Sequence, residues 1–71
     1  MKRYTYTVEI GYALHLYYTS RSSAMLAAKR AARSKEVVTL TRTNNKTGET
    51  VYLNPDGSVT LTAEKQNWRK R

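Results

Sequence analysis

The chain contains no cysteine, and this absence removes two common ways of stabilising a small domain. Disulfide bonds are excluded, and so are zinc sites built on thiolates. A single histidine, His15, also leaves no histidine-rich metal site, so the sequence predicts neither a metal nor another cofactor. Because cysteine-free chains suit a reducing interior, we expect a cytoplasmic protein.

Long apolar runs are lacking as well. The longest uncharged stretch, residues 10–20, includes a glycine, a histidine and three tyrosines. A membrane-spanning helix needs roughly 20 predominantly apolar residues. The first residues, Met1 to Arg3, lead directly into a tyrosine- and threonine-rich segment without the apolar block of a secretion signal. We therefore expect no membrane partner.

Acidic residues are scarce and scattered, which leaves little material for catalysis. The five carboxylates show no spacing typical of a catalytic pair or a magnesium site. Glu9 is the only acid close to His15 in sequence, and nothing else supports a serine or threonine nucleophile. No glycine-rich phosphate loop is present either. The sequence predicts that the protein is not an enzyme.

Thirteen lysines and arginines leave a net charge of +8 on only 71 residues. A charge of this density weakens the folded state by self-repulsion and attracts polyanions over roughly 10 Å. Most of it falls on residues 19–46 and 65–71, whereas residues 47–64 are acidic. We expect an acidic partner, with solvation of the surface as the simpler alternative.

Alternation of apolar and polar residues from Tyr4 to Tyr18 predicts β-structure. The segment is long for one strand, and a three-residue loop at residues 11–13 predicts a hairpin instead. In that hairpin Ile10 lies opposite Leu14, and Val8 lies opposite Leu16.

A run of helix-forming residues follows four Ser and Thr residues that could cap it. Its small side chains fill one stripe, which allows close packing on a sheet. Its cations fill the opposite face. We expect a helix over residues 24–33.

The second half predicts strands at residues 36–43 and 49–53 and a third strand after a turn at Asn54-Pro55-Asp56-Gly57. Pairing across this turn sets Leu53 opposite Val59 and Val51 opposite Leu61. Threonines at positions 39, 41 and 43 would leave a sheet edge unguarded by charge.

These elements predict one α+β domain over residues 1–62, with the order β-β-α-β-β-β, one antiparallel sheet and the helix on one face. Residues 63–71 form a basic tail. Trp68 in this tail has two alternative roles: contact with bases, or packing onto the sheet to complete a small core.

Cations and aromatic side chains together suggest nucleic-acid binding. The exposed helix face and the tail would contact phosphates, and Tyr17 or Trp68 would contact bases. Tyrosine is also enriched at protein interfaces, so its role stays open. The predicted nucleic-acid-binding residues are Arg21, Lys29, Arg30, Arg33, Lys35, Tyr17, Trp68, Arg69, Lys70 and Arg71.

The leading hypothesis is a small basic protein that binds DNA or RNA. The alternative is a non-enzymatic inhibitor or adaptor that binds an acidic protein surface, such as a phage or mobile-element protein that blocks a nucleic-acid-handling enzyme of the CRISPR type. A homodimer formed through an exposed sheet edge is compatible with both.

Overall fold

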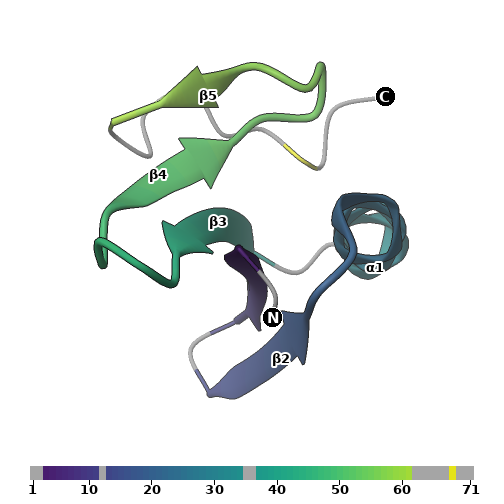
Figure 1. Cartoon of the computed structure of the whole chain (residues 1–71). Coiled ribbons are helices and arrows are strands. Elements are labelled where there is room, and N and C mark those ends of the chain that lie inside the picture. Colours follow the sequence, from purple (N-terminus) through teal and green to yellow (C-terminus); the bar gives the residue numbers. More distant parts are fainter. Residues whose placement is uncertain (1–2, 12, 35–36, 62–67, 69–71) are drawn as a thin grey trace.

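One helix and one antiparallel sheet make up the computed structural model, which describes residues 3–11, 13–34, 37–61 and 68. The strand order is β2-β1-β3-β4-β5. Figure 1 views the helix α1 end-on, with the strands curving past one side of it. The α+β prediction and its element order are confirmed. The bounds are β1 Tyr4–Ile10, β2 Leu14–Tyr18, α1 Arg21–Arg33, β3 Val38–Asn44, β4 Thr50–Leu53 and β5 Val59–Thr60.

The first hairpin joins β1 to β2 in the predicted register. Ile10 pairs with Leu14, and Val8 pairs with Leu16. Gly11 has a φ of +64°, a conformation that glycine adopts without strain. Its N–H donates a hydrogen bond of 2.8 Å to the Val37 carbonyl, which ties the hairpin loop to the chain entering β3.

Pairing between β1 and β3 joins the two halves of the chain. It runs from Tyr4 opposite Asn44 to Ile10 opposite Val38. β3 therefore lies between β1 and β4, and its threonines do not stand on an edge as the sequence suggested. The sheet edges are β2 and β5. A two-residue β5 offers little edge, so β2 is the main exposed one.

The helix begins after Ser20, whose hydroxyl accepts a hydrogen bond from the Ser23 N–H at 3.4 Å. This is the capping that a serine before an alanine-rich run favours. Ala24, Ala28 and Ala32 form the buried stripe, and α1 packs against β1, β2 and β3. Because these side chains end at Cβ, the helix axis lies close to the sheet.

Substituting Ala28→Leu is expected to lower the free energy of unfolding by about 1–3 kcal/mol, because added methylenes overpack a filled site. Ala28 is fully buried in the core cluster that contains Val8 and Leu40. Urea denaturation followed by circular dichroism measures the change. The control Lys29→Leu adds apolar volume on the neighbouring exposed position and should stay within about 0.5 kcal/mol. Equal stability of the two variants would contradict the packing described.

The last hairpin turn joins β4 to β5. The Gly57 N–H donates to the Asn54 carbonyl at 2.9 Å, and Gly57 has a φ of +92°. Leu53 pairs with Val59, as predicted. The predicted pairing of Val51 with Leu61 is wrong, because β5 ends at Thr60 and Leu61 is 76% exposed.

Trp68 is buried, with 5% of its surface exposed, in the same cluster as Leu40 and Leu53. The structure thus takes the core-packing alternative, and the indole face is not presented to bases. The predicted boundary between residues 62 and 63 lies outside the described residues. Because Trp68 lies beyond that boundary yet packs in the core, a chain ending at residue 62 would lose part of its core.

Candidate nucleic-acid interface

Three cations lie together on the outer face of α1. Lys29, Arg30 and Arg33 are all exposed, and they fall within a third of a turn on a helical wheel of about 100° per residue. Lys29 and Arg33 are separated by about 6 Å along the axis at 1.5 Å per residue. That distance is close to two nucleotide steps of one strand at about 3.4 Å each. We call these three residues the basic helix face.

No carboxylate offsets this charge on the helix, since the sequence of α1 contains no acidic residue. The acids of the described residues lie elsewhere: Glu9 on β1, Glu49 before β4 and Asp56 in the turn to β5. Within the described part of the chain, no ion pair engages the basic helix face, and the recorded ion pair joins His15 to Glu9. Among the described residues, no carboxylate is therefore recorded that offsets the charge of the basic helix face.

Arg21 is separated from the basic helix face. It begins α1, and its Nη2 donates a hydrogen bond of 3.3 Å to the Gly57 carbonyl. A Cβ at position 57 would lie 2.7 Å from the same Nη2, so glycine leaves room for this contact. Arg21 thus connects the start of the helix to the β4–β5 turn, and its contribution to phosphate binding stays a prediction.

Tyr17 is 68% exposed, as expected for a ring that contacts a partner. It pairs with Thr7 on β1, next to the Val8–Leu16 pair that faces the core. Because neighbouring residues in a strand point to opposite faces, Tyr17 lies on the sheet face away from α1. One flat ligand therefore cannot contact Tyr17 and the basic helix face together. Lys35, Arg69, Lys70 and Arg71 lie outside the described residues.

His15 and Glu9 form a pair on the same open face of the sheet. His15 Nε2 lies 3.1 Å from Glu9 Oε2, and both side chains are nearly half exposed. Among the described residues, no serine or threonine hydroxyl is recorded in a hydrogen bond to His15. The pair is a surface contact that holds the imidazole in place.

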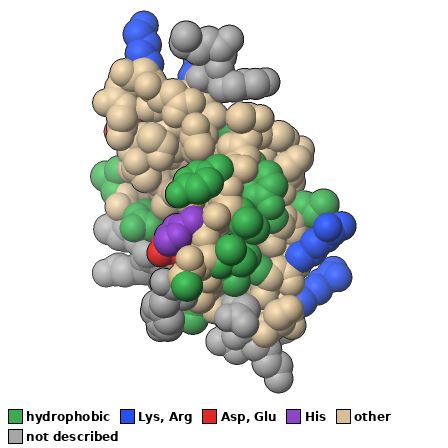
Figure 2. All heavy atoms as spheres, turned by 90° about the horizontal axis from the view of Figure 1, so that it is seen from below, with side chains coloured by type: hydrophobic (Ala, Val, Ile, Leu, Met, Phe, Trp, Pro, Cys, Tyr) green, Lys and Arg blue, Asp and Glu red, His purple; other side chains and the backbone are tan. Residues whose placement is uncertain are grey.

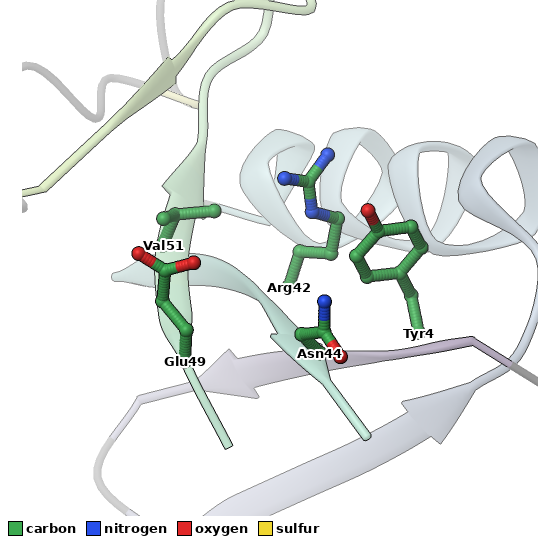
Figure 3. A pocket seen from close by; sticks show the side chains of 5 residues that line it. All are labelled: Tyr4, Arg42, Asn44, Glu49 and Val51. Carbon is green, nitrogen blue, oxygen red and sulfur yellow. The ribbon is translucent and has the colours of Figure 1, made fainter. Parts of the chain in front are cut away.

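Arg42 is a cation that the sequence analysis did not single out. Its guanidinium carbon lies 4.4 Å from the centre of the Tyr4 ring, a cation–π contact. Figure 3 shows both side chains in a shallow pocket that Asn44, Glu49 and Val51 complete. The alternation of Val38, Leu40 and Arg42 could have predicted this position. It places Arg42 on the same face of β3 as the two apolar residues, which is the face toward α1.

This pocket does not suit a cofactor or a large ligand. Its cavity volume is about 40 Å³, room for one or two water molecules, whereas drug-sized ligands occupy roughly 300–1,000 Å³. The Glu49 carboxylate also lines it together with Arg42, which weakens its attraction for an anion. Arg42 therefore serves the structure through its contact with Tyr4.

Lowering the pH from about 5 to about 3 is expected to loosen the β4–β5 turn. The Ser58 hydroxyl and N–H donate to Asp56 Oδ1 at 2.7 and 2.9 Å and hold the pKa of Asp56 below its ordinary value of 3.8. The unfolded chain then binds a proton at higher pH than the folded one, so this stabilisation is present above pH 3.8 and disappears as the pH falls through the folded-state pKa. The hydrogen-exchange rate of the Ser58 amide, measured at both pH values, reports this loss of stabilisation.

The variant Asp56→Asn is the control for this pH dependence. It keeps an acceptor oxygen for Ser58 but has no carboxyl group to protonate. Its turn should exchange at a rate that changes less between these pH values than in the wild type. The same acid-induced change in both proteins would assign the effect to another group.

None of the described helices is both long and apolar enough to cross a membrane. In the described ranges, no three His, Asp or Glu side chains gather as a metal site would require. Comparison with protein-family models, with curated proteins and with solved structures gave no significant match.

Proposed function

We propose that the protein binds nucleic acid through the basic helix face, without catalysis. The observation that carries this proposal is the group of three exposed cations on a helix that has no acidic residue. Phosphate contacts by lysine and arginine release condensed counterions, which supplies most of the affinity of non-specific binding. A net charge of +8 adds attraction at longer range.

The geometry favours backbone contact over base readout. The basic helix face is flanked by short polar residues and by Leu26, which is 50% exposed. Within it, no asparagine or glutamine is available for bidentate contact with adenine. We therefore propose that binding tolerates many sequences and that phosphates position the helix.

Fluorescence anisotropy with labelled single- and double-stranded DNA and RNA tests the proposal at several salt concentrations. Three phosphate contacts predict a slope of log affinity against log salt between about −2 and −3. Binding with such a slope supports the proposal. Absence of binding at low salt would overturn it and would direct attention to the alternative, an inhibitor or adaptor that docks these cations on an acidic protein.

A further inference from the structure

We propose that two copies of this chain associate through their β2 strands to form one continuous antiparallel sheet. Among the described strands, β2 stands at the edge of the sheet and pairs with β1 alone. An edge strand presents a row of backbone N–H and C=O groups that can pair with another strand. The side chains and the charge of β2 suit a second copy of the same strand.

The edge lacks the devices that keep strand edges apart. Leu14–Tyr18 contains no lysine, no proline and no acidic residue. Natural sheets commonly guard an edge with charge, proline or a bulge. Leu14 is 51% and Tyr17 is 68% exposed, so this short strand presents one large, exposed side chain on each face of the sheet.

Figure 2 looks onto this side of the molecule and shows apolar side chains gathered beside the histidine. The lysines and arginines drawn in this view lie at its rim. In a chain of charge +8, two copies repel each other over most of their surfaces. Among the described residues, strand β2 carries no lysine or arginine, so two copies can meet there without bringing those cations together.

Strand β2 is also complementary to itself. Residues opposite each other in an antiparallel pair point to the same face, so the two-fold axis must pass through a residue position. An axis at Leu16, the middle residue of β2, pairs the whole strand. Leu14 then lies opposite Tyr18 of the second copy, Leu16 opposite Leu16, and His15 opposite Tyr17. Apolar side chains meet on the helix side, and the imidazole meets a phenol on the open side.

This arrangement fixes where the two helices lie. The two-fold axis runs perpendicular to the shared sheet, so both copies of α1 cover the same face. The contact itself is small, because β2 has five residues. We therefore expect a dimer that forms with rising concentration in the micromolar range, in contrast to an obligate one.

Sedimentation equilibrium without nucleic acid tests self-association between about 10 μM and 1 mM. The wild type should approach twice the 8.2 kDa mass of one chain. Leu14→Lys should weaken association by about tenfold or more, because it places a cation on each side of the seam. The control Leu61→Lys adds the same charge beyond β5, at a residue that is 76% exposed, and should behave as the wild type. A monomeric wild type, or a larger effect of the control, would overturn the proposal.

Disulfide cross-linking tests the proposed register of the two β2 strands. Because the chain contains no cysteine, an introduced cysteine is the only thiol that can react. Two copies of Leu16→Cys would place their Cα atoms about 4.5–5.5 Å apart across the axis, within the range of a disulfide. We expect this variant to form a covalent dimer at least about tenfold faster under mild oxidation than Leu14→Cys, which faces Tyr18 instead. Equal rates would overturn the register. Neither test uses nucleic acid, so failure of the proposed function leaves both results interpretable.

Discussion

Replacing Trp68 with alanine is expected to lower the free energy of unfolding by about 3–5 kcal/mol. The side chain is 5% exposed and packs with Leu40 and Leu53. A core in a chain of this size contributes only about 3–5 kcal/mol of net stability, so the variant should be largely unfolded at room temperature. Circular dichroism during urea denaturation measures this, because the substitution removes the only tryptophan fluorophore.

Two controls separate the volume of Trp68 from its chemistry. Trp68→Phe keeps most of the ring and removes an indole N–H that has no hydrogen-bond acceptor among the described residues, so we expect a loss below about 1.5 kcal/mol. Leu61→Ala removes a large side chain that is 76% exposed and should change stability by less than about 0.5 kcal/mol. A Trp68→Ala variant as stable as the wild type would contradict the burial of this residue.

The triple variant Lys29→Ala, Arg30→Ala, Arg33→Ala is expected to bind DNA and RNA about 100-fold more weakly near 0.1 M salt. Each lost phosphate contact removes about 0.9 from the salt slope, so the slope should fall by two to three, about its whole expected value. All three residues are exposed, and alanine favours a helix, so the fold should persist. Anisotropy measures affinity, and circular dichroism confirms the fold.

A matched pair of double variants tests position against net charge. Lys29→Ala with Arg33→Ala and Arg3→Ala with Lys46→Ala each remove one lysine and one arginine. Arg3 and Lys46 are exposed beside the β3–β4 turn, where the Arg3 carbonyl accepts a hydrogen bond from Asn45. We expect the Lys29/Arg33 double variant to lose at least about tenfold more affinity for DNA and RNA than the Arg3/Lys46 double variant. Equal losses would mean that overall charge, and no particular face, drives binding.

Much of this fold follows from local sequence pattern. A period of two sets the strand faces, and Gly11 and Gly57 fix the turns beside them, so the pairs Val8–Leu16 and Leu53–Val59 could be predicted. The pairing of β1 with β3 could not, because no short-range signal links residues so distant in sequence. The error at Leu61 has a similar origin, since alternation does not say where a strand ends.

The candidate site was only partly predictable. Helical spacing placed Lys29, Arg30 and Arg33 on one exposed face, as the structure has them. The same spacing could not show that Arg21 would reach the Gly57 carbonyl, which belongs to a turn formed much later in the chain. Trp68 offered no periodic apolar neighbours, so sequence alone left its burial undecided.

The pairing of β1 with β3 has a kinetic consequence. Thr5 on β1 donates a hydrogen bond of 2.9 Å to Asn45, 40 positions away in the sequence, whereas the turns of the three hairpins close locally. Hairpins form in about 1–10 μs, but contacts between distant segments are slower because a long loop must close first. We expect the three hairpins and α1 to form early and the docking of β1 on β3 to limit the folding rate. Substitutions at this seam or at Gly57 should therefore mainly slow folding, because both sets of contacts are formed by the rate-limiting step.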